Sequence, residues 1–182
     1  PFFLAVGFVR PHVPWYAPQK WLDMFPLENI KTPPYKKDDF NDIPGFAKTV
    51  SETPQMPTTE ALIKKGEWKK ALQAYMACIA FVDAQIGKVL DGLENSEHAN
   101  NTVVVLWSDH GYHLGEKNRF AKQALWERDT RTVLIVKGID KKPAQICAAP
   151  VQLIDIYPTL LDLCQLPASE QLEGHSLTSL IE

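Results

Sequence analysis

The sequence lacks the features that mark a membrane span or a nucleic-acid-binding surface. Its longest apolar runs are about eight residues, against the roughly 20 that a helix needs to cross a bilayer. The net charge is -3, and no block of about five or six like charges occurs. We therefore expect a soluble chain that binds neither nucleic acid nor membrane.

Cysteine is also scarce. The three cysteines are Cys78, Cys147 and Cys164, an odd number without the spacing of a metal site. Cys78 falls in a helical pattern where a small buried thiol would fit. We expect structural thiols, and so small a number does not reveal the redox compartment.

The chain has no initiating methionine, and it begins inside an apolar run from Phe2 to Phe8. Such a run predicts a strand that is buried on both faces, and Arg10–Pro14 predicts a rigid turn after it. We expect an internal piece of a longer protein. A polar side chain at the strand exit is well placed to serve a site.

One long helix and one irregular segment stand out in the first half of the chain. Residues 26–57 hold six prolines and little periodicity, which predicts a surface excursion with at most short helices. This excursion is either a specificity region or a simple insertion. Apolar residues then recur at alternating spacings of four and three, which predicts an amphipathic helix; they are Trp68, Leu72, Tyr75, Ile79, Val82, Ile86, Val89 and Leu93.

The second half alternates strand and helix patterns. Residues 102–107 and 131–136 are β-branched runs typical of buried strands, and residues 151–163 predict a helix that begins near Asp155. This alternation predicts an α/β fold with a mostly parallel sheet flanked by helices.

Asp109 and His110 follow the strand predicted at 102–107. The exit of a buried parallel strand is a common place for a ligand site, and the turn into Gly111 can let both side chains converge. Taken alone, the pair is either a metal or catalytic site or a hydrogen-bonded structural pair.

Several segments together resemble the sulfatase family, and within it the iduronate sulfatase branch of the alkaline-phosphatase-like superfamily. The most specific match is Ser108–Lys117, followed by Phe120–Lys122 and Trp126–Arg128, which resembles the family's second conserved block. Weaker matches are Phe3–Pro14 with Gly7, Pro11, His12 and Pro14, then Tyr75–Leu90 with Asp83 and Gly87, and Asp155–Leu163.

The resemblance implies a divalent cation held by Asp109 and His110. The family's usual ion is calcium, which we expect here. Many sulfatases have Asn at the second position, whereas His110 supplies a nitrogen, and nitrogen suits zinc or manganese better than calcium. The iduronate-like branch does carry His at this position.

The resemblance also implies that His12 and Lys122 are catalytic residues that contact the sulfate. Sulfate ester hydrolysis needs negative charge on the sulfate and on the departing alkoxide to be stabilised, which suits a lysine and a proton-donating histidine. Tyr112, His113 and Arg119 are either substrate contacts or exposed polar residues of the same loop.

Sulfatases take their nucleophile from a cysteine, or sometimes a serine, in the motif Cys-x-Pro-Ser-Arg, where this residue is oxidised to formylglycine. Cys147 is followed by Ala-Ala-Pro and Cys164 by Gln-Leu-Pro, so neither fits, and Cys78 has no nearby proline. Residues 1–182 therefore resemble the central part of a sulfatase catalytic domain. We expect the formylglycine in an upstream segment and a further subdomain downstream.

Three functions remain open. The parent protein is a sulfuric ester hydrolase acting on sulfate esters of sugars, or a phosphodiesterase or phosphonate hydrolase of the same superfamily, or the chain is a non-catalytic binding fragment. We expect the isolated fragment to be inactive and to self-associate through uncovered apolar surface. By resemblance alone, the parent protein is exported to the periplasm, the lysosome or the medium.

Overall fold

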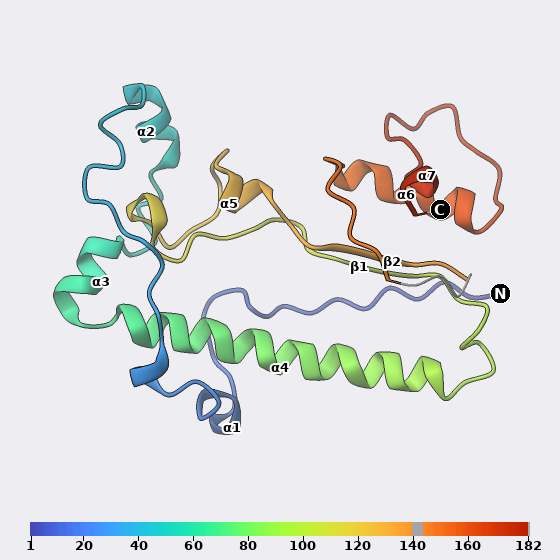
Figure 1. Ribbon diagram of the computed structural model, residues 1–182, viewed down its shortest axis with the longest axis horizontal. Helices are drawn as coiled ribbons and strands as arrows, with labels where there is room; N and C mark the ends of the chain where they lie inside the picture. The colour runs from blue at the N-terminus through green and yellow to red at the C-terminus, as the bar shows by residue number, and fades with distance from the viewer. Residues whose placement is uncertain (140–143, 182) are drawn as a thin grey trace. The chain divides into compact units, whose positions relative to one another are not determined.

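The computed structural model describes residues 1–139 and 144–181 of the chain (Figure 1). These residues fold as two compact units, each of which draws on two stretches of the sequence. The first unit comprises Pro1–Gly92 and Gly111–Thr130, and the second comprises Leu93–His110 and Arg131–Glu182.

The first unit consists of helices joined by irregular chain. Its helical segments are α1 (Gln19–Leu22), the 3-10 turn η1 (Leu27–Asn29), α2 (Gly45–Ser51), α3 (Thr59–Lys65), most of α4 (Trp68–Glu94), the 3-10 turn η2 (Glu116–Asn118) and α5 (Glu127–Thr130). Between residues 26 and 57 the helical segments are η1 and α2, which confirms the predicted irregular excursion with short helices.

α4 confirms the predicted long amphipathic helix. α3 precedes it and is joined to it by a short turn. Thr58 caps α3 by accepting the N–H of Ala61 at 3.2 Å. α3 ends at Gly66, whose φ of 68° lies in the left-handed region that favours glycine at a helix end. The chain can therefore turn sharply before α4 begins at Trp68.

The core of the first unit joins three distant segments. Ile30 of the excursion, Leu72 of α4 and Phe120 of the loop before α5 are buried against one another. Around them pack the partly buried side chains of Trp15, Phe25, Leu62, Trp68, Ala71, Met76, Tyr112 and Leu114. Burial of this apolar surface holds the excursion and the loop against α4.

The strand predicted at Phe2–Phe8 is not formed, and its predicted burial is wrong for this chain. These residues have no strand pairing, and Phe3 is 85% exposed. A strand needs a neighbour to bond its N–H and C=O groups, and no described segment pairs with this one. The segment instead runs beside α4 (Figure 1), and a groove of about 330 Å³ is lined there by Phe8, Val9, Arg10, Phe81, Val82 and Gln85.

The second unit contains a two-stranded sheet of β1 (Val104–Trp107) and β2 (Leu134–Lys137), as both strand predictions expected. The pairing is antiparallel, with Val104 opposite Lys137, so the prediction of a mostly parallel sheet is wrong for the described residues. The chain leaves β1 at Ser108, whose N–H donates to the carbonyl of Val133 at 3.1 Å. Because the connection starts and ends at the same end of the pair, the strands must run in opposite directions.

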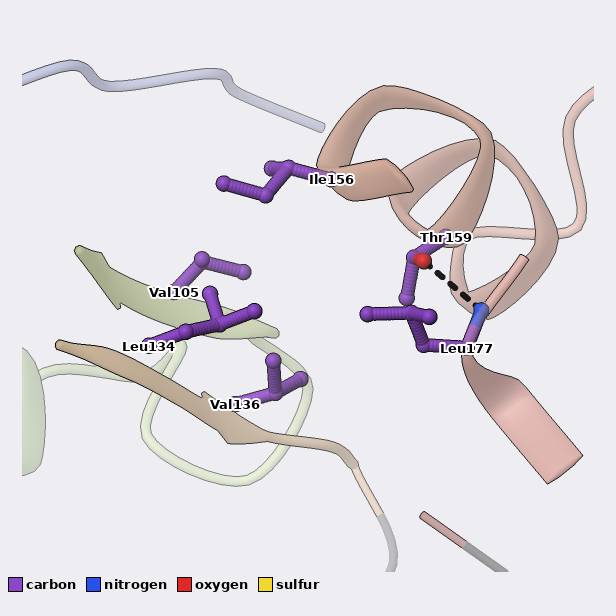
Figure 2. Close-up of a pocket in the computed structure, with 6 residues that line it drawn as sticks. All are labelled: Val105, Leu134, Val136, Ile156, Thr159 and Leu177. Carbon is purple, nitrogen blue, oxygen red and sulfur yellow. Dashed lines mark hydrogen bonds between the residues drawn. The ribbon is translucent and has the colours of Figure 1, made fainter. Parts of the chain in front are cut away.

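One face of this sheet packs on the helix predicted near Asp155. The helical segments here are η3 (Leu153–Asp155), α6 (Ile156–Leu163) and α7 (Thr178–Ile181), which confirms that prediction. Figure 2 shows the apolar seam between the sheet and α6, lined by Val105, Leu134, Val136, Ile156, Thr159 and Leu177. Within it, the hydroxyl of Thr159 accepts the N–H of Leu177 at 2.9 Å. The opposite face of the sheet carries Ile135, which is 56% exposed.

In the part of the chain that the structure describes, no helix has both the length and the apolar character of a membrane span. Cys78 is buried in α4, as predicted, and burial raises the pKa of its thiol. Cys147 and Cys164 are exposed free thiols.

Candidate active site

Asp109 and His110 lie just beyond the end of β1 and face each other. Oδ2 of Asp109 is 3.5 Å from Nε2 of His110, and the side chains are 74% and 32% exposed. The hydroxyl of Ser108 donates to the carbonyl of His110 at 3.0 Å, which fixes the turn that follows the strand. The predicted convergence of the two side chains at a strand exit is therefore present.

The spacing of these two donors suits adjacent ligands of one cation. Two ligands that bind calcium at about 2.3–2.6 Å and at right angles are about 3.3–3.7 Å apart, which includes the observed separation. Within residues 1–139 and 144–181, no third His, Cys, Asp or Glu side chain completes a cluster with them. Metal binding by Asp109 and His110 stays a prediction.

His12 lies in an exposed turn between two cis peptide bonds, Arg10–Pro11 and Val13–Pro14. Its Nδ1 is 2.7 Å from the carbonyl oxygen of Val13. A carbonyl can only accept, so this contact assigns the proton to Nδ1 and leaves Nε2 as the nitrogen that can take up or give a proton. The indole of Trp15 anchors the turn by donating to the carbonyl of Pro11 at 2.8 Å.

Lys122 lies in the loop between η2 and α5, and the loop backbone is held at consecutive residues. The hydroxyl of Tyr112 donates to the carbonyl of Phe120 at 2.9 Å, and the N–H of His113 donates to the carbonyl of Ala121 at 3.0 Å. Nη2 of Arg119 donates to the carbonyl of Lys122 itself at 2.5 Å. Lys122 is half-buried on this fixed backbone.

The turn that carries His12 and the loop that carries Lys122 meet in one aromatic cluster. The Trp15 ring lies 6.1 Å from the Phe120 ring and 6.0 Å from the Tyr112 ring. Tyr75 of α4 stacks on Tyr112 at 5.8 Å. The first unit thus brings together the two segments that hold the predicted sulfate contacts.

The four predicted catalytic and metal residues fall two in each unit. His12 and Lys122 belong to the first unit, and Asp109 and His110 belong to the second. The prediction that all four line one cleft stays a prediction.

Two of the predicted substrate contacts, Tyr112 and His113, bond to the protein itself. Burial, with a smaller effect of the neighbouring Tyr75, raises the pKa of Tyr112 well above its usual range, so its hydroxyl is a neutral donor. His113 is 1% exposed, and its Nδ1 is 2.7 Å from Oδ1 of Asp129. Direct substrate contact by these two residues stays a prediction, which their present contacts do not favour.

Arg119 is the third predicted substrate contact, and it is 5% exposed. Burial lowers the pKa of its guanidinium, while the nearby Asp129 acts in the opposite direction. Nη2 is engaged by the Lys122 carbonyl and by Thr53 Oγ1 at 3.2 Å, but Nε and Nη1 are buried without a partner among the described residues. Substrate contact by Arg119 stays a prediction.

Asp129 is the residue of this region that the sequence did not single out. It is 4% exposed and contacts both His113 and the backbone of Ala124. The family-like block ends at Arg128, and nothing in the pattern indicates that the next residue points inward. The pairing with His113 becomes visible only in the folded loop.

The proline-rich excursion lies against the loop that carries Lys122. Asp39 Oδ1 accepts from Nζ of Lys117 at 3.0 Å, and the Phe40 ring lies 6.5 Å from the Trp126 ring. The indole N–H of Trp126 donates to Ser51 Oγ at 2.8 Å. The two interpretations of the excursion, a specificity region or a simple insertion, stay predictions.

Comparison with known proteins finds similar sequences among sulfatases. A protein of Formosa agariphila described as a sulfatase is 54% identical over 182 residues, which is 100% of this chain and 36% of that protein. Mouse iduronate 2-sulfatase is 30% identical over 206 residues, covering 92% of this chain and 36% of its own length. The chain thus spans little more than a third of the length of these curated relatives.

A solved structure shares the fold. A protein in complex with its substrate D-glucosamine-2-N,6-O-disulfate matches with a TM-score of 0.66 at 22% identity, covering 95% of this chain and 46% of that one. The family model described as Sulfatase matches residues 1–166. The resemblance inferred from the motifs is confirmed, and the chain belongs to the sulfatase family.

Proposed function

We propose that this chain forms the central part of the catalytic domain of a sulfuric ester hydrolase that acts on sulfated sugars. The observation that carries the proposal is the packing of the His12 turn on the Lys122 loop through Trp15 and Phe120. Relatives support the substrate class, since one is described as an ulvan-active sulfatase and one solved structure as a 2-O GAG sulfatase.

In this proposal Asp109 and His110 hold a divalent cation. Their 3.5 Å separation suits two adjacent ligands of one ion. Calcium is the ion we propose, and it takes about six to eight oxygen-rich ligands, so other parts of the intact protein would supply the rest. A bound cation would stabilise negative charge on the sulfate oxygens.

His12 is the proposed proton donor to the departing alkoxide. Because Nδ1 donates to the Val13 carbonyl, Nε2 is the atom that can carry the transferred proton. A donor held near the leaving oxygen lowers the barrier by supplying that proton as the bond breaks. The exposed turn allows a substrate to approach the ring.

Lys122 is the proposed second sulfate contact. An ammonium is a compact charge that can follow a sulfate oxygen as charge builds up on it. The unpartnered Nε and Nη1 of Arg119 are further proposed donors to the substrate, and Tyr112 and His113 are proposed to line the same wall. The nucleophile of the intact enzyme is proposed to be a formylglycine from another segment.

A phosphodiesterase or phosphonate hydrolase is the second candidate function. The Asp109–His110 pair is compatible with this second function, because an aspartate and a histidine also bind the metals that assist phosphoryl transfer. A binding fragment without catalysis is the third. We further propose, from family membership, that the intact protein is exported.

A substrate panel tests these alternatives. The intact protein is incubated with calcium and with matched sulfate monoesters of sugars, a phosphate diester and a phosphonate ester, and the release of inorganic sulfate or of the alcohol is followed. We expect sulfate release to exceed the phosphorus reactions by at least about 100-fold in kcat/KM, a difference of roughly 3 kcal/mol in transition-state binding. Preferred turnover of the phosphate diester or phosphonate would replace the proposal with the second candidate, and metal binding without turnover would favour the third.

A further inference from the structure

Asp129 is a buried carboxylate whose two oxygens both face the Lys122 loop. It lies in the short helix α5 and is 4% exposed. Oδ1 lies 2.7 Å from Nδ1 of His113, and Oδ2 accepts the N–H of Ala124 at 3.1 Å. A buried carboxylate is costly unless such partners satisfy it, so these bonds account for its place.

The same carboxylate is the counter-charge of Arg119. Oδ2 of Asp129 is 3.9 Å from Nη2 of Arg119, and both side chains are almost completely buried. Nη2 in turn donates to the carbonyl of Lys122 at 2.5 Å. Removing one charge of a buried pair leaves the other uncompensated. The Arg119 guanidinium would then be driven to move, and its bond to Lys122 with it.

The backbone that follows Lys122 is therefore held at two points by groups that depend on Asp129. Arg119 holds the carbonyl of Lys122, and Asp129 holds the N–H of Ala124. Gln123 between them has a φ of 74°, a left-handed conformation that a residue other than glycine keeps only when its surroundings impose it. The two anchors lie on either side of Gln123 and can impose that conformation.

We propose that Asp129 is a positioning residue that sets the place of Lys122 through Arg119 and the Ala124 N–H. The inference rests on the proposed function, because the role of Lys122 in contacting sulfate belongs to it. Both carboxylate oxygens already face protein donors, so Asp129 acts through its neighbours and does not touch substrate. A shift of about 1 Å in a catalytic group can cost about 100-fold in rate.

The test is a double-mutant cycle in the intact protein, with kcat and KM measured on a sulfated sugar. Asp129→Asn removes the charge and one acceptor with little change in shape. We expect it to lower kcat/KM by about 10- to 100-fold, mainly through kcat. In a Lys122→Ala background the same change should cause less than about a threefold further loss, because Asp129 then has no catalytic group to position. A residue with a merely structural role would multiply the two losses.

Controls separate the effect from loss of folding. Asp23→Asn removes an exposed carboxylate of the same unit, outside the proline-rich excursion, and should leave kcat/KM unchanged within about twofold. Asp129→Glu keeps the charge partner of Arg119 and should retain more activity than Asp129→Asn. If Asp129→Asn does not fold, the cycle is run with Asp129→Glu, which should lose several-fold alone and little in the Lys122→Ala background.

A second readout does not depend on turnover. Amide hydrogen exchange at Ala124 should quicken at least about tenfold in Asp129→Asn relative to Asp23→Asn. Wild-type kcat/KM in Asp129→Asn, multiplied losses in the double variant, or unchanged exchange at Ala124 would each overturn the positioning role. If the wild type turns over no sulfate ester, the proposed function fails, and the exchange at Ala124 alone then decides whether Asp129 holds the loop.

Discussion

Gly115 has a backbone φ of 141°, and a Cβ added there would lie 2.5 Å from Cζ2 of Trp68. The indole cannot easily give way, because its Nε1 donates to the carbonyl of Leu114 at 2.9 Å. We expect Gly115→Ala to lower the free energy of unfolding by about 2 kcal/mol or more, through the strained backbone and the overlap with the ring. Denaturant titration of the intact protein measures it.

Gly92→Ala is the matched control, since Gly92 is exposed in α4 and a Cβ there would meet nothing within 4 Å. Alanine in an exposed helical position should raise the free energy of unfolding by about 0.5–1 kcal/mol. Equal stabilities of the two variants would show that the close approach of Gly115 to Trp68 does not constrain the fold.

At the residue scale, the sequence could name the residues of a motif but not their partners. Asp109, His110 and Lys122 stand in one continuous block that resembles the family, so they could be proposed from the sequence. The burial of Asp129 against His113 could not be predicted from the sequence, because an exposed helical turn and a buried one have the same local pattern there. The left-handed φ of Gln123 could not be predicted either, because glycine is the residue that usually indicates this conformation and glutamine is not.

At the element scale, the start of α6 depends on one carboxylate. Asp155 accepts the N–H of Gln152 at 2.9 Å and the N–H of His175 at 2.9 Å. The bond from His175, with that from Gln152, holds the pKa of Asp155 below its usual range. A carboxyl with a lowered pKa in the folded state stabilises above its unfolded pKa, and loses that contribution as the pH falls through the folded value.

We therefore expect Asp155→Asn to lower the free energy of unfolding by about 1–2 kcal/mol at pH 7, because one charged acceptor of two backbone donors is lost. The difference from the wild type should shrink as the pH falls below about 4. Thermal unfolding between pH 7 and pH 3 measures it. Thr159→Val is the control, because it removes the hydroxyl that accepts the N–H of Leu177. A threonine hydroxyl does not titrate, so the effect of this change should not depend on pH. A pH-independent difference for Asp155→Asn would contradict the assignment.

Elements with their own periodicity could be predicted, whereas their pairing could not. The pattern of apolar residues from Trp68 to Leu93 fixed α4, because a helix is defined by local spacing. The apolar run at Phe2–Phe8 misled, because a strand exists only with a partner and no described segment provides one. The prediction of a parallel sheet was wrong for a related reason. The direction of β2 depends on the end of β1 to which the intervening loop leads the chain back.

At the scale of the whole molecule, the proposed function needs groups that the 182-residue chain does not supply. None of its three cysteines stands in the Cys-x-Pro-Ser-Arg motif, and the Asp109–His110 pair supplies two donors where calcium takes about six to eight. We expect the isolated chain to hydrolyse no aryl sulfate and to bind calcium weakly. Turnover assays with calcium and calorimetric titration measure both.

The isolated chain should also self-associate, because large apolar side chains are uncovered. Phe3 is 85% exposed and Leu125 is 90% exposed, and surfaces of this kind promote association. Light scattering over a range of concentrations measures it.

For the turnover assay of the isolated chain, calcium-dependent hydrolysis that survives removal of contaminating sulfatase would show that the nucleophile had been overlooked.

The metal role of Asp109 and the sulfate role of Lys122 are tested most directly by comparing Asp109→Ala and Lys122→Ala in the intact protein, with bound metal and sulfate-ester turnover determined for each. A carboxylate can be a cation ligand and an ammonium cannot, so Asp109→Ala should lose metal and activity together. Lys122→Ala should keep its metal and lose about 100-fold or more in kcat/KM, as for removal of a group that stabilises developing charge. Unchanged metal content and unchanged activity in Asp109→Ala would contradict the account.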